Sequence, residues 1–142
     1  FAMLNRGAAH APKPPKYTPA ELRGIRRSRE NWLRIITVDQ TRCWMDLGEK
    51  QAEIIGGMSA IFGFGYYVAV HDHGADSVPA RIIRGGMSAA AGAVGAGYMV
   101  TKQDAMAFDA ACDRVRNMIE ASTDDAVVYA SKKLQEAAKG LM

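Results

Sequence analysis

The residues best suited to chemistry lie together in the middle of the chain, in the run HDHGAD at positions 71–76. Imidazole nitrogens and carboxylate oxygens are common metal ligands. In an extended loop, His71 and His73 would point to the same side, and Asp76 could supply a third ligand. The same residues suit a solvated turn between two helices, where Gly74 or an acid ends the first helix. We favour the turn, and we expect no bound metal and no cofactor.

No other group of residues forms a recognisable catalytic pattern. The third histidine, His10, lies in a proline-rich stretch, away from any candidate nucleophile. Cys43 and Cys112 lack the paired spacing of a zinc or redox motif, so we expect two buried free thiols. No glycine-rich loop ends in Lys-Ser or Lys-Thr, as a phosphate-binding loop would. We therefore predict that the protein is not an enzyme.

A basic helix is predicted near the start of the chain. Thr18, Pro19 and Glu21 give the usual order of a cap, a first-turn proline and an early acid. The helix that follows has one apolar side and one arginine side, and residues 1–45 hold nine basic residues against three acidic ones. Such asymmetry predicts an anionic partner, which could be lipid headgroups, a nucleic acid or an acidic subunit. The residues predicted to bind it are Arg23, Arg26, Arg27 and Arg29.

Two uncharged segments occupy the centre of the sequence. Residues 54–70 and 85–101 each have no charged side chain over 17 positions, and a polar connector, residues 71–84, separates them. Both are rich in glycine, and each glycine costs roughly 0.8–1 kcal/mol relative to alanine inside a helix. Small residues recur every four positions, which permits close approach of two helices. We predict a tightly packed helical hairpin whose contact face is formed by Gly56, Ala60, Gly85, Ser88, Ala89, Gly92, Ala93, Ala96 and Gly97.

Two environments would accommodate this hairpin. In a membrane, segments of 17 residues are just long enough to span the hydrocarbon core, with tyrosine and basic residues at the interfaces. In that case both termini lie on one side, in the cytoplasm or the mitochondrial matrix by the positive-inside rule. In water, the same hairpin could be buried within the amphipathic helices on either side of it. We favour the membrane and retain the buried hairpin as the alternative.

The whole chain is predicted to be all-α. Residues 1–17 form an extended, proline-rich basic arm, residues 18–53 a basic amphipathic helical region, residues 54–101 the apolar hairpin, and residues 102–142 a pair of amphipathic helices. A capping box at Thr101 and Asp104 starts the first helix of that pair, and Ser122 to Asp124 restart the pattern for the second.

The stretch ARIIRGGMSAAAGAVGAGYMV, residues 80–100, resembles the glycine-zipper transmembrane helices of the mitochondrial inner-membrane preprotein translocase family. An accessory subunit of respiratory complex I is related to that family. The resemblance covers the hairpin region, and members have four spanning segments where this sequence offers two. It implies a small helical subunit that packs against larger membrane proteins.

Our leading hypothesis is a non-catalytic accessory subunit of a membrane complex, such as a respiratory-chain complex of the mitochondrial inner membrane. Its partners would be other protein subunits and lipid. The alternative is a cytoplasmic helical-bundle binding protein, or a nucleic-acid-associated regulator that uses the arginine-rich helix.

Overall fold

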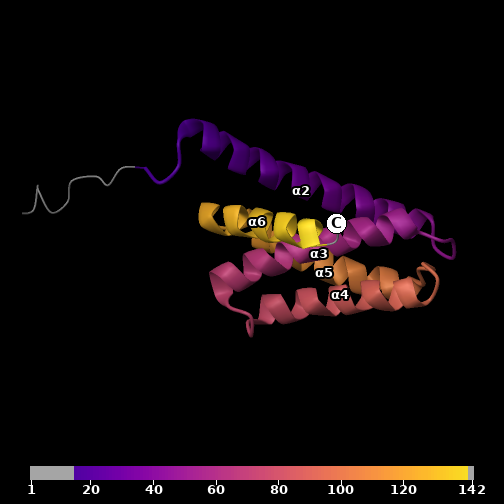
Figure 1. Cartoon of the computed structure of the whole chain (residues 1–142). Coiled ribbons are helices and arrows are strands. Elements are labelled where there is room, and N and C mark those ends of the chain that lie inside the picture. Colours follow the sequence, from indigo (N-terminus) through magenta and orange to yellow (C-terminus); the bar gives the residue numbers. More distant parts are fainter. Residues whose placement is uncertain (1–14, 141–142) are drawn as a thin grey trace, which may run out of the picture.

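The computed structural model describes residues 15–140, and these form five helices with no strand between them (Figure 1). The helices are α2 (Pro19–Met45), α3 (Ala52–His73), α4 (Val78–Gly95), α5 (Lys102–Glu120) and α6 (Asp124–Gly140). The all-α prediction is confirmed for this part of the chain. The arm predicted over residues 1–17 lies almost wholly outside the described residues.

Helices α2 and α5 start where their capping residues predict. Thr18 accepts a hydrogen bond from the Glu21 backbone N–H, and the Glu21 carboxylate accepts one from the Thr18 N–H. Thr101 and Asp104 form the same reciprocal pair at the start of α5. A capping box of this kind satisfies two backbone donors that the first helical turn leaves free. Local sequence therefore sets the beginnings of α2 and α5.

Helix α3 is the centre of the bundle and packs against each of the other four helices (Figure 1). Its large apolar side chains, among them Phe62 and Phe64, are completely buried. The Phe64 ring stacks on Trp32 of α2 with centroids 4.6 Å apart, and Phe62 lies 5.9 Å from the Phe108 ring of α5. Helices α2 and α4 lie on opposite sides of this centre (Figure 1).

The hairpin of α3 and α4 is present, but its connector is much shorter than the sequence predicts. Residues 71–73 continue α3, and residues 78–84 already belong to α4, so only residues 74–77 lie between the helices. Gly74 ends α3 with a positive φ of 94°, and the Ser77 side chain caps α4 by accepting from the Ala80 N–H. The predicted 14-residue connector is wrong, because the polar residues at its two ends belong to α3 and α4.

The second uncharged segment does not remain helical to its end. Helix α4 stops at Gly95, and Gly97 and Tyr98 both take positive φ angles, 74° and 67°. The chain then pairs with the α2–α3 loop, where the Gln51 N–H donates to the Tyr98 carbonyl at 2.8 Å. This short pairing ties the two loops at one end of the bundle together.

Among residues 15–140, only α3 is long and apolar enough to cross a membrane by length and composition. The core helix of a bundle meets the same criterion, and 56% of the most apolar 18-residue window of α3 is buried inside the protein. The membrane-spanning character of the hairpin stays a prediction.

Candidate functional site

The HDHGAD residues do not form the loop in which a metal could be shared. His71 and His73 belong to the last turn of α3, and two positions along a helix correspond to a rotation of about 200°. The two imidazoles therefore leave opposite sides of the helix, and Asp76 lies exposed in the following turn. No group of three or more His, Cys, Asp or Glu residues within 15–140 is placed to hold a metal ion.

Asp72, the residue between these histidines, has a structural role instead. Its carboxylate accepts hydrogen bonds from the Thr123 N–H at 3.0 Å and from the Thr123 hydroxyl at 2.8 Å, at the start of α6. His71 lies 3.0 Å from the same carboxylate. Burial acts to raise the pKa of Asp72, but the hydrogen bonds from His71 and Thr123 outweigh it and lower the pKa below its ordinary value. Asp72 thus joins α3 to α6 in its ionised form.

Both cysteines are buried in the core, as their sequence context predicts. Cys43 is 1% exposed and Cys112 is fully buried, 3.5 Å from the sulfur of Met58. Burial raises the pKa of Cys43 to about 11 and that of Cys112 to about 12. Since the thiolate is the reactive form, neither thiol is suited to nucleophilic or redox chemistry.

The small residues predicted to pack the hairpin are mostly on the outside of the bundle. Ala93 is buried and Ala89 is half-buried, whereas the rest of the predicted set is exposed: Gly56, Ala60, Gly85, Ser88, Gly92, Ala96 and Gly97. A Cβ atom added at Gly56, Gly85 or Gly92 would meet nothing within 4 Å. As an account of contacts within this chain, the predicted contact face is wrong for these exposed residues.

Different glycines make the close contacts between helices. A Cβ atom at Gly65 of α3 would lie 2.5 Å from a methyl carbon of Val115, and one at Gly86 of α4 would overlap Ala111 and come within 3.2 Å of the Phe62 ring. The buried row of α4 is Ala80, Ile83, Gly86, Ala90 and Ala93. Helix α4 is therefore rotated so that Ile83, its fully buried large side chain, faces the core.

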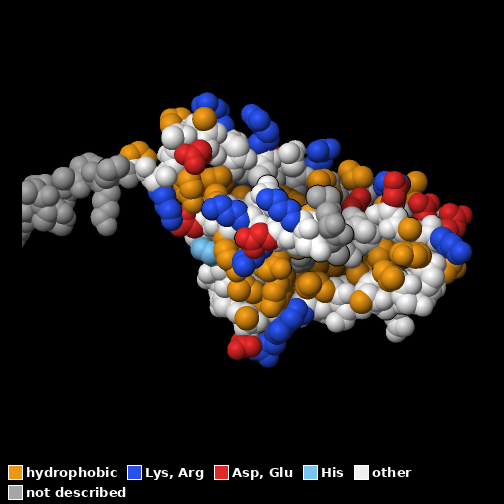
Figure 2. All heavy atoms as spheres, viewed as in Figure 1, with side chains coloured by type: hydrophobic (Ala, Val, Ile, Leu, Met, Phe, Trp, Pro, Cys, Tyr) orange, Lys and Arg blue, Asp and Glu red, His pale blue; other side chains and the backbone are white. Residues whose placement is uncertain are grey.

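This rotation leaves one long side of α4 facing outward, without a neighbour among residues 15–140. We call this side the outer face of α4, formed by Gly85, Met87, Ser88, Ala91, Gly92, Val94 and Gly95. It has no charged side chain, although Arg81 and Arg84 lie at its beginning. In Figure 2 the lower edge of the molecule, along α4, is mostly orange and white beyond a cluster of charged side chains.

The predicted anion-binding arginines divide into two groups. Arg29 points inward: its guanidinium donates to the Ser122 carbonyl at 2.9 Å and to the Asp124 carboxylate at 2.8 Å, and its side chain is 22% exposed. Arg23, Arg26 and Arg27 are exposed on the outer side of α2. Figure 2 shows basic side chains along the upper edge of the molecule, where α2 runs. The prediction that Arg29 binds an external anion is wrong, because Asp124, 95 positions further along the same chain, binds its guanidinium.

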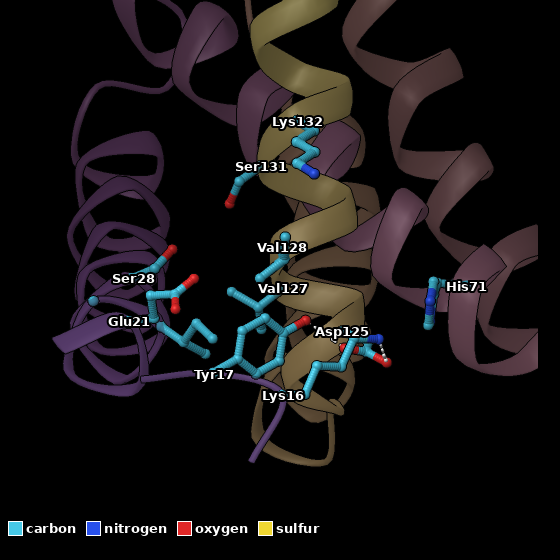
Figure 3. A pocket seen from close by; sticks show the side chains of 12 residues that line it. Lys16, Tyr17, Glu21, Ser28, His71, Asp125, Val127, Val128, Ser131 and Lys132 are labelled. Atoms are coloured by element: carbon cyan, nitrogen blue, oxygen red, sulfur yellow. Dashed lines mark hydrogen bonds and ion pairs between the residues drawn. The ribbon is translucent and has the colours of Figure 1, made fainter. Parts of the chain in front are cut away.

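A groove of about 650 Å³ separates the beginning of α2 from α6 (Figure 3). Gly24, Ile25 and Ser28 line one wall, and Val127, Val128 and Ser131 line the other. At one end the Tyr17 hydroxyl donates a short hydrogen bond to Asp125, which also pairs with Lys16 at 2.9 Å. These two contacts lower the pKa of Asp125, and the hydrogen bond between Tyr17 and Asp125 raises the pKa of Tyr17 to about 12. They hold residues 16–17 against α6.

Comparisons of the chain with protein-family models, curated proteins and solved structures found no match.

Proposed function

We propose that this chain is a non-catalytic helical subunit that works as a folded bundle in water, and that it docks on a partner protein through the outer face of α4. The observation that carries this proposal is the set of glycines that the chain's own packing does not require. Gly85 and Gly92 lie inside α4 with open space beside them. Each lowers helix stability by roughly 0.8–1 kcal/mol relative to alanine.

The chemistry of the face defines the partner. A surface of glycine, serine and alanine lets another helix come close, so that backbones and small side chains touch. Because the face has no charged side chain between Gly85 and Gly95, ion pairs do not select what binds there. The proposed partner is therefore an uncharged helix that also presents small residues, within a larger protein assembly.

The folded bundle is a poor candidate for a membrane span. Helix α3 is surrounded by α2, α5 and α6, whose outer sides bear charged residues such as Arg23, Arg26 and Asp113. If α3 crossed a bilayer in this fold, those charges would enter lipid, at a cost of about 2.5–3.5 kcal/mol each on insertion scales. We therefore propose that burial in the bundle explains the apolarity of α3. The mitochondrial and respiratory-chain role implied by the resemblance stays a prediction.

Site-specific photocrosslinking in the cells that make the protein tests the docking face. A photoreactive residue replaces Ser88 at the middle of the outer face of α4, and the matched control replaces Asn117, which is exposed on α5. We expect one discrete crosslinked product from position 88 and none from position 117. Adding Gly92→Leu should abolish that product while the isolated chain stays folded, because open space surrounds Gly92.

Equal crosslinking from both positions, or a product that survives Gly92→Leu, would contradict the proposed face. A product that contains two copies of this chain would contradict the proposed partner.

A further inference from the structure

The outer side of α2 carries a row of four arginines, with Glu30 between Arg27 and Arg34. We call this row the arginine stripe: Arg23, Arg26, Arg27 and Arg34, all exposed. Relative to the first arginine they occupy positions i+3, i+4 and i+11, which share one side of an α-helix. At 1.5 Å per residue the stripe is about 16 Å long. It lies on the opposite side of the bundle from α4 (Figures 1 and 2).

The stripe keeps its positive charge because acidic side chains within the fold do not neutralise it. In the part of the chain that the structure describes, none of its four guanidinium groups forms an ion pair. Glu30 is the acid on the same side of α2, while Glu21 caps the helix and Asp124 binds Arg29. Four cations therefore face outward over three helical turns with one carboxylate among them.

We infer that the arginine stripe binds the phosphate backbone of a nucleic-acid duplex without reading its sequence. Guanidinium groups donate paired hydrogen bonds that match the geometry of phosphate, and backbone contacts supply most of the affinity of non-specific binding. The side chains between the arginines include no amide that could form a paired contact with adenine except Asn31, at the edge of the stripe. Contacts from such a row would fix position on the duplex rather than sequence.

The surroundings of the stripe favour a nucleic acid over a lipid surface. A helix that lies on a membrane inserts large apolar residues beside its basic ones. The bulky residue of this region, Trp32, is stacked on Phe64 inside the bundle and is not free to insert. Between Arg23 and Arg34 the exposed positions hold no large apolar side chain. Leu22 and Val38 are exposed just beyond its two ends, so the stripe offers charge along its length and apolar side chains only outside it.

Fluorescence anisotropy with the full chain and a labelled 30-base-pair DNA duplex tests this inference, at salt concentrations from 50 to 200 mM. Four phosphate contacts alone should weaken binding by about 150-fold across that range, since the logarithmic slope is about −0.9 per contact. The triple variant Arg23→Gln, Arg27→Gln, Arg34→Gln should reduce the slope by about three. A control with the same change in charge, Lys50→Gln, Arg84→Gln, Lys102→Gln, should leave the slope nearly unchanged, because these residues lie off the stripe.

Three results would overturn the inference. The first is no binding to the duplex at 50 mM salt, and the second is an equal loss of affinity in the stripe variant and the control variant. The third is stripe-dependent binding to vesicles that contain phosphatidylserine, or to polyglutamate, that is tighter than binding to the duplex. Circular dichroism of each variant verifies that it is folded, which is expected because all six side chains are exposed. A negative result for duplex binding would not bear on the proposed docking face of α4, because the two surfaces share no residue.

Discussion

Two neighbouring glycines of α4, Gly85 and Gly86, should respond in opposite directions to the same substitution. Gly85 faces outward with open space around it, so Gly85→Ala adds a methyl group that meets nothing within 4 Å. Alanine is favoured over glycine inside a helix by roughly 0.8–1 kcal/mol. We therefore expect Gly85→Ala to raise the free energy of unfolding by about that amount, and the midpoint temperature by about 2–4 °C for a chain of this length.

Gly86→Ala should destabilise the same helix. Its added methyl group would overlap the Ala111 side chain and come within 3.2 Å of the Phe62 ring, and both neighbours are buried. Overpacking of a well-filled core typically costs about 1–3 kcal/mol, which exceeds the gain in helix propensity. The two variants should therefore differ by about 1–3 kcal/mol, because the gain in helix propensity is common to both and only Gly86→Ala carries the cost of overpacking.

Urea unfolding of the purified chain, followed by circular dichroism at 222 nm, measures both variants under identical conditions. The comparison is well controlled, because the residues are adjacent and the chemical change is the same. If Gly85→Ala were the destabilising variant and Gly86→Ala the stabilising one, α4 would be rotated by about 100° from its place in this fold. The row of small residues predicted from the sequence would then face the core, and the reasoning about the outer face of α4 would be refuted.

Three further changes test individual contacts. Arg29→Gln should lower the free energy of unfolding by about 1–3 kcal/mol, measured by urea unfolding, because the carbonyl and carboxylate groups that Arg29 binds are left unpaired; Arg23→Gln, its exposed counterpart, should change it by less than about 0.5 kcal/mol. Asp72→Asn should lower stability by about 1 kcal/mol at pH 7 through weakened capping of α6. Because the pKa of Asp72 is lowered on folding, its ionised form stabilises the protein above the ordinary value of 3.8, and this contribution disappears as the pH falls through the folded-state pKa. In thermal melts, the midpoint temperatures of the original protein and of Asp72→Asn should therefore converge as the pH is lowered below 3.8. Addition of about 100 µM zinc should leave the midpoint temperature unchanged within about 1 °C, since His71 and His73 point away from each other. A clear rise in the midpoint temperature would contradict this placement of the two histidines.

The sequence alone predicts the helical character of the chain and several of its boundaries. The starts of α2 and α5 are predicted by two capping boxes, Thr18 with Glu21 and Thr101 with Asp104, because capping depends on residues three positions apart. Local signals of this kind can be read without knowledge of the fold.

The orientation of α4 could not be predicted in the same way. Its uncharged stretch consists of glycine, alanine and serine, so hydrophobic periodicity hardly distinguishes one side from another. What decides the orientation is the burial of Ile83 and the contacts of Gly86 with Phe62 of α3 and Ala111 of α5, and these contacts are tertiary. A prediction that counts small residues finds the repeating spacing and misses which row is buried.

The roles of Arg29 and Asp72 depend on contacts that are distant in sequence. Arg29 binds groups 93 and 95 positions away, and Asp72 binds the backbone of a residue 51 positions away. Both meet the beginning of α6, where free backbone donors and acidic caps are concentrated. Without that placement, Arg29 is indistinguishable from the other arginines of α2, and the sequence pattern puts Asp72 in a polar loop.

Carbonate extraction of the native protein tests most directly whether α3 is the core of a water-facing bundle. We predict that the chain is released from membranes at alkaline pH and remains helical and monodisperse in buffer without detergent. Retention in the membrane pellet, with release by detergent alone, would contradict this and would favour the membrane-spanning hairpin.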